Sequence, residues 1–194
     1  MPSFDLRGIK AAKYVNTSGT ITYTSPTSVG DAMNVALELR YAEGRLYAEG
    51  TLAEYMRLAV GGTISIGVKY IPDEAQQLLF GATTNSRSIN VSGSPKSITG
   101  LKYTAKDVPD YVGVAFYAPD KIDGETKYSC VFIRKASFGV PAMSYQTKSD
   151  TIVFNTPTTT GEFLAEDSTN QVMIETGICD TVADAEAWIT SVLA

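Results

Sequence analysis

Histidine is absent from this chain of 194 residues, and only two cysteines are present. The absence of histidine removes the most frequent general base, proton shuttle and metal ligand of proteins. Cys130 and Cys179 have no metal-ligand spacing, and neither has a histidine that could activate its thiol. Cys130 stands in the apolar run CVFI, which favours a small buried side chain. We therefore expect no metal site, no cofactor, no catalytic residue and no enzymatic activity.

Charged residues and long apolar runs are also scarce. Charged residues make up 19% of the chain, the formal net charge is −5 and the pI is about 4.8. This acidic balance provides no electrostatic surface for holding a nucleic acid tightly. No apolar run reaches transmembrane length, and the opening MPSFDLRG lacks the apolar core of a signal peptide. We expect a protein that is made in the cytoplasm and has no membrane contact.

Adjacent carboxylates and a glycine pair are the remaining candidates for a catalytic or phosphate-binding site. Asp73-Glu74 stands at the start of a predicted helix, where negative charge is favoured. Glu166-Asp167 lies in a polar stretch that we interpret as a solvated loop. Val60-Gly61-Gly62 lacks the lysine and the hydroxyl residue of a phosphate-binding loop. Each pattern has a structural explanation, so none of them predicts an active site.

Alternation of apolar and polar residues dominates the first half of the chain. Such alternation predicts strands at 6–15, 20–29, 33–41, 45–60 and 63–71. Pro26 predicts that the second strand lies at a sheet edge or is broken there. We expect tight turns at Glu43-Gly44 and Gly61-Gly62, because glycine adopts positive φ angles without steric cost. These strands together predict an antiparallel meander.

Two helices are predicted, one in the middle of the chain and one at its end. IPDEAQQLLFG at 71–81 has Pro72 near its start and Gly81 at the position of a C-cap. At 181–193, apolar residues fall at helical spacing, and Thr181 with Asp184 resembles a capping box.

The second half is predicted to add a long loop and further strands. Residues 82–109, rich in Ser, Thr, Asn and Gly, predict a long polar loop. YVGVAFY at 111–117 predicts a central strand covered on both faces, followed by a turn at Asp123-Gly124 and a return strand. Short strands are expected at 151–155 and 171–176. The whole pattern, 1–194, predicts one mainly β domain: an antiparallel β-sandwich or barrel with a short central helix and a C-terminal helix.

The order and spacing of several segments resemble the major tail proteins, or tail tube proteins, of long-tailed, non-contractile bacteriophages. The matching segments cover most of the chain: Leu6–Tyr14, Leu46–Glu49, IPDEAQQLLFG at 71–81, YVGVAFY at 111–117, and Pro141 followed by Tyr145–Lys148. IPDEAQQLLFG is the most specific of them. The chain departs from the family at Glu49-Gly50, where Asp-Asn is frequent. It also has a C-terminal helix in place of the immunoglobulin-like extension that some members carry.

This resemblance implies a fold of the tail-tube type and subunits that form hexameric rings. The rings would stack with other tail proteins into the hollow tube of a virion, assembled in the host cytoplasm, through which DNA passes without specific binding. On this interpretation the polar alternates of the meander line the lumen: Asn34, Glu38, Arg40, Thr63, Ser65 and Lys69. The alternative is that this polar face packs under a loop or a helix.

Three further residues are candidates for a subunit interface. Arg57 interrupts the alternation of its strand, so it either pairs with Glu54 or faces a neighbouring subunit. Trp188 is the large apolar residue of the terminal helix, where it serves as a core or docking anchor. Other functions remain open at this point: a secretion-system tube subunit, a tail-completion protein, a monomeric β-sandwich module that binds a sugar or a protein, or an enzyme.

Overall fold

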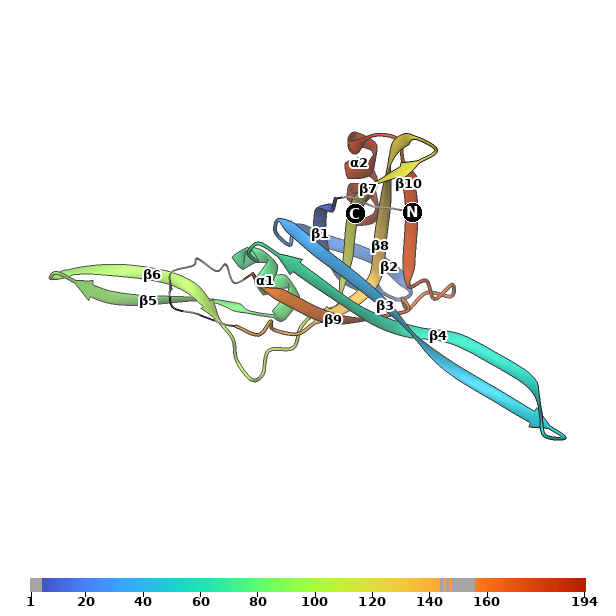
Figure 1. Ribbon diagram of the computed structural model, residues 1–194. Coiled ribbons are helices and arrows are strands. Elements are labelled where there is room, and N and C mark those ends of the chain that lie inside the picture. The colour runs from blue at the N-terminus through green and yellow to red at the C-terminus, as the bar shows by residue number, and fades with distance from the viewer. Residues whose placement is uncertain (1–4, 144, 146, 148–155) are drawn as a thin grey trace.

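The computed structural model describes residues 5–143, 145, 147 and 156–194 (Figure 1). Their elements are β1 (Arg7–Thr17), β2 (Thr20–Ser28), β3 (Ala32–Ala48), β4 (Thr51–Val68), α1 (Asp73–Phe80), β5 (Thr83–Val91), β6 (Ser94–Lys102), β7 (Val112–Ile122), β8 (Glu125–Phe138), β9 (Thr158–Leu164), β10 (Ile174–Cys179) and α2 (Val182–Val192). The strand predicted at 151–155 lies outside the described residues. The protein is mainly β, and its strands pair antiparallel.

One large sheet forms the body, with strand order β2-β1-β7-β8-β9-β4-β3. Strand β8 is long enough to pair with β10 along 128–133 and with β9 along 135–138, on the side away from β7. The sheet therefore divides at β8 into two parts that pack over a shared core. This arrangement is consistent with a β-sandwich that carries a C-terminal helix, as the sequence predicts.

Strand β7 separates two buried clusters. Its Val114 and Phe116 belong to the cluster that includes Leu79 of α1. Its Tyr117 faces the other way, into the cluster that includes Ile189 of α2. The prediction of a central strand with both faces covered is confirmed, because residues 112–117 are all buried. Figure 1 shows α1 and α2 beside different parts of the sheet.

Both predicted helices are present with the predicted ends. Helix α1 has Asp73 and Glu74 in its first turn, and Gly81 caps its last turn in the left-handed conformation at φ 69°. Helix α2 has Thr181 as its N-cap, where the hydroxyl accepts a hydrogen bond from the Asp184 backbone N–H at 3.1 Å. The capping chemistry is local, which is why the sequence was sufficient to place these ends.

Both turns predicted for the β3–β4 region are wrong. The chain reverses at Glu49-Gly50, with φ angles of 52° and 80°, as a type I′ turn requires. Gly61-Gly62 lies inside β4, where the register to β3 shifts. A Cβ on Gly62 would overlap the ring of Phe163, so this glycine permits the close approach of β9.

The long polar loop predicted at 82–109 is also wrong over most of its length. Residues 83–102 form the β5–β6 hairpin, which turns at Ser92-Gly93. Its Ile89, Val91 and Ile98 alternate with Ser, Thr and Asn residues, and the Ser/Thr-rich composition masks this period-2 pattern. Only 103–111, after β6, is irregular.

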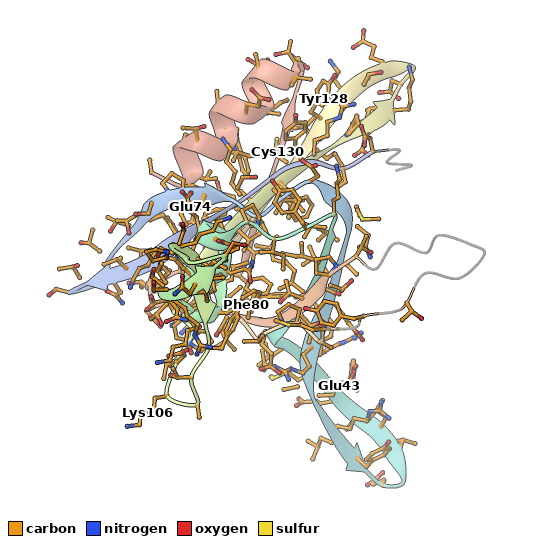
Figure 2. The ribbon with its side chains drawn as sticks, turned by 90° about the vertical axis from the view of Figure 1, so that its left-hand side faces the viewer. Glu43, Glu74, Phe80, Lys106, Tyr128 and Cys130 are labelled. Atoms are coloured by element: carbon orange, nitrogen blue, oxygen red, sulfur yellow. The ribbon has the colours of Figure 1, made fainter. Side chains whose placement is uncertain are left out.

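Two hairpins extend from the body in different directions (Figure 1). One is the β5–β6 hairpin, whose strands pair only with each other among the described elements. The other is the outer part of β3–β4, residues 40–60, here called the arm. Strand β4 pairs with β9 only along 62–67, so the arm is a two-stranded ribbon with two free edges. Figure 2 shows Glu43 on the arm, beyond the body of the protein.

Candidate functional site

The two faces of the arm have different chemistry. Directly opposite residues share a face, so the pairs Tyr41–Ala59, Glu43–Arg57 and Arg45–Tyr55 lie on one side of the ribbon. On that side the Arg57 guanidinium lies 3.4 Å from the Glu43 carboxylate and 3.8 Å from the Tyr41 ring centroid. Arg45 also contacts Glu43, at 3.4 Å. This charged face of the arm is therefore internally paired.

The opposite side, here called the apolar face of the arm, has no such pairing. It carries the register pairs Ala42–Leu58, Gly44–Met56 and Leu46–Glu54. The three large side chains are 58% (Leu46), 64% (Met56) and 59% (Leu58) exposed. Exposed aliphatic side chains aligned on one face of a ribbon mark an interaction surface. Nothing in the described part of the chain covers them.

The polar face nearer the body contains most of the residues predicted to line a lumen. The register places Asn34, Glu38 and Arg40 of β3 beside Thr63 and Ser65 of β4, on one side of the sheet. Strand β9 continues this surface, and Glu162 lies 3.4 Å from the Arg40 guanidinium. The structure therefore brings five of the six predicted residues together. Lys69 lies beyond the end of β4, with its amine 4.0 Å from Asp31.

The predicted pairing of Arg57 with Glu54 is wrong. The two residues are three positions apart in one strand, so their side chains leave opposite faces of the ribbon. Arg57 pairs with Glu43 across the strands, whereas Glu54 stands opposite Leu46 on the apolar face. Because side chains alternate between the two faces of a strand, residues three positions apart in it cannot pair on one face.

Trp188 packs within the subunit. A Cβ placed on Gly177 of β10 would lie 3.2 Å from the indole nitrogen, so the indole covers this part of β10. Trp188 is half-buried against the cluster that contains Ile189. The indole thus anchors α2 to the sheet, and its role at a subunit interface remains a prediction.

The solvated loop predicted at Glu166-Asp167 is confirmed for Asp167, which is exposed in an irregular segment, but is wrong for Glu166, which is buried. The Glu166 carboxylate is buried and lies 3.1 Å from the Arg134 guanidinium, which also contacts Glu175. The Lys135 amine donates to both oxygens of Asp167 at 2.7 Å and thereby holds the pKa of that carboxyl below its usual value. These pairs connect the segment after β9 to strand β8. Each carboxylate has a structural partner, which leaves no free acid–base pair at this site.

The two cysteines lie side by side on β8 and β10, with their sulfur atoms 3.7 Å apart. Cys130 is buried, as predicted, and burial raises the pKa of its thiol to about 12. Among residues 5–143 and 156–194, no group of three or more Cys, Asp or Glu side chains is arranged to hold a metal ion. Neither α1 nor α2 has the length and hydrophobicity needed to cross a bilayer.

No family model matches the chain, and no curated protein is significantly similar to it.

The residues that sequence reasoning missed are those of the apolar face of the arm. A turn at Glu43-Gly44 would place Leu46, Met56 and Leu58 in the same strand, whereas the observed register brings Leu46 of β3 to the same face as Met56 and Leu58 of β4. A Glu-Gly turn at 49–50 leaves strands of nearly equal length, 17 and 18 residues, on its two sides, and the Glu-Gly pair was the signal available in the sequence.

Proposed function

We propose that this chain is a structural virion protein that assembles with itself into stacked hexameric rings and forms the tail tube through which phage DNA is ejected. The observation that carries the proposal is the arm, a long two-stranded ribbon with an exposed apolar face. A hairpin of two strands is at best marginally stable alone in water, and it gains stability when it packs against another surface. The proposed surface is a neighbouring subunit.

The edges of the sheet support the same proposal. Strands β2 and β3 end the strand order, and β3 runs for 17 residues with one edge unpaired among the described elements. A long free edge pairs readily with another chain, and closing a sheet across subunits removes it. Contacts between different surfaces of identical subunits close into rings or continue as filaments, which is the geometry that a tube requires.

The polar face near the body suits the inner wall of such a tube. Glu38, Arg40 and Glu162 give it both signs of charge, and Arg40 is already paired with Glu162. A surface without free clusters of lysine or arginine binds the phosphate backbone weakly, so DNA can slide past it. Luminal Asn34, Thr63 and Ser65 would add small polar groups. In this proposal the protein is not an enzyme and requires no cofactor.

The test is negative-stain electron microscopy of the purified protein over a range of concentrations, with light scattering in parallel. Six-membered rings or hollow tubes are the expected result. Rings that never stack would favour a tail-completion protein over a tube subunit. A protein that stays monomeric at its highest concentration would overturn the proposal and favour a monomeric binding module.

A further inference from the structure

The β5–β6 hairpin is strongly cationic in an acidic protein. Residues 83–102 contain Arg87, Lys96 and Lys102 and no acidic residue, whereas the whole chain has a net charge of −5. None of these three side chains forms an ion pair with a described acidic residue. The hairpin thus presents three unpaired positive charges to its surroundings.

One face of this hairpin combines these charges with aliphatic side chains. The register pairs Arg87 with Ile98 and Ile89 with Lys96, so two successive rungs each hold one cation and one branched aliphatic residue. Val91 continues the same face, and it is exposed like Ile98. The opposite face carries hydroxyl groups such as Ser86 and Ser97, which bond to each other. The cationic–aliphatic face is therefore a candidate docking surface.

A cleft of complementary chemistry lies between β3 and the β7–β8 hairpin. It measures about 300 Å³ and is lined by Val35 and Leu37 on one side and by Phe116, Ala118 and Val131 on the other. Asp120 and Ser129 complete its lining. The cleft, here called the Asp120 cleft, is thus an apolar hollow with a carboxylate in its wall.

Asp120 has an unused hydrogen-bonding atom. The residue is only 6% exposed, and one carboxylate oxygen accepts a hydrogen bond from the Ser129 hydroxyl. The other oxygen, Oδ1, has no partner among the described residues. Lys127 stands opposite Asp120 in the register, but its amine binds Asp180 at 2.7 Å and Glu125 at 3.0 Å. A buried carboxylate with an unpaired oxygen is unfavourable, so a cation bound in the cleft beside Asp120 would stabilise this carboxylate.

We propose that the cationic–aliphatic face of the β5–β6 hairpin of one subunit docks in the Asp120 cleft of the next. The proposal rests on the self-assembly proposed above and identifies one of its contacts. Ile89 or Ile98 fills the apolar hollow, and the cation on the same rung, Lys96 or Arg87, reaches Asp120. Charge complementarity selects this occupant, because the hairpin has three positive charges and no negative charge.

Other segments of the chain match the cleft less well. The apolar face of the arm carries Glu54 and no cation, so it would bring like charge to Asp120. The arginines of the arm, Arg45 and Arg57, are already paired with Glu43. The hairpin extends away from β7 and β8 of its own subunit (Figure 1), so the contact joins two copies through different surfaces. Such a contact is heterologous and propagates around a ring or along a tube.

The first experiment compares charge variants with matched controls. Lys96→Glu reverses a charge on the docking face, and Lys106→Glu makes the same change on the exposed segment after β6, where Figure 2 shows Lys106. Asp120→Asn removes the buried carboxylate, and Asp123→Asn removes an exposed carboxylate at the adjacent turn. We expect Lys96→Glu and Asp120→Asn to raise the concentration needed for assembly by about tenfold or more, with little change for the controls.

The second experiment locates the contact directly. The photoreactive variant Ile98→p-benzoylphenylalanine is mixed with ¹⁵N-labelled wild-type chain, irradiated and analysed by mass spectrometry. The expected adduct joins residue 98 of one copy to the segment 116–131 of a labelled copy. If the protein assembles but the adducts map to other segments, the docking contact is wrong and the proposed self-assembly stands. The same holds if residue 98 crosslinks to added duplex DNA in place of the chain. Absence of any assembly overturns both this contact and the proposed function.

Discussion

Replacing Leu58 by glutamate is expected to block assembly while leaving the isolated subunit folded. Leu58 lies on the apolar face of the arm and is 59% exposed in the free subunit. Full burial of a leucine side chain is worth about 1.5–3 kcal/mol, so covering the exposed part contributes about 1–2 kcal/mol per contact. Glutamate loses this contribution and adds the cost of removing water from a carboxylate.

The control is Leu52→Glu on the charged face of the same arm. Leu52 is 53% exposed and stands opposite Tyr47, so the two variants match in chemistry, net charge and exposure and differ in the face that they modify. Because both positions are exposed, each variant should keep the thermal stability of the wild-type subunit to within about 0.5 kcal/mol.

The assay is sedimentation velocity over a concentration series, with electron microscopy of each sample. A loss of at least about 1.4 kcal/mol per contact corresponds to a rise of about tenfold in the critical concentration of Leu58→Glu. Leu52→Glu should assemble like the wild-type protein. If Leu58→Glu assembles at the wild-type concentration, or if both variants are impaired equally, the apolar face of the arm is not the assembly contact.

Three further predictions concern the subunit itself. Gly161→Ala should lower the thermal unfolding temperature, because its Cβ would lie 2.6 Å from a backbone oxygen of β8. The control is Gly100→Ala, which has open space around its Cβ. Equal changes in the unfolding temperature of the two variants would contradict the close packing at Gly161. The pKa of Asp167 is lowered by the Lys135 amine, so this pair stabilises the fold above the ordinary aspartate pKa near 4 and is lost as pH falls further. Thermal unfolding of Lys135→Met should therefore depend less on pH below about 4 than that of the wild type, and identical curves would argue against the pair. Cys130, whose thiol pKa is raised to about 12 by burial, should resist iodoacetamide in the folded protein and react after denaturation, whereas rapid labelling of the folded protein would contradict its burial.

Local chemistry in the sequence determined the helices and several strands. Gly81 and Thr181 mark helix ends through backbone conformation and a side-chain hydrogen bond, both of which involve only near neighbours. The apolar run at 111–117 identified a strand that is buried on both faces. Pro26 correctly indicated an edge, since β2 ends the strand order of the sheet.

Glycine in the β3–β4 region could not be interpreted from the sequence alone. Gly50 and Gly62 cannot be distinguished by residue type, yet Gly62 accommodates the ring of Phe163 and Gly50 forms a turn. The difference depends on where β9 lies, and β9 is about 100 residues away along the chain. The burial of Glu166 was likewise not predictable from nearby residues, because its ion-pair partner Arg134 is distant in the sequence.

The sequence by itself determined the class of fold, the two helices and the polar alternation that places Asn34, Glu38, Arg40, Thr63 and Ser65 on one face. Only the tertiary structure decided which hairpins leave the body, which charges are already paired, and which surfaces remain without a partner. Alternation and capping are properties of neighbouring residues, whereas exposure and pairing depend on contacts between strands that the chain brings together from distant positions.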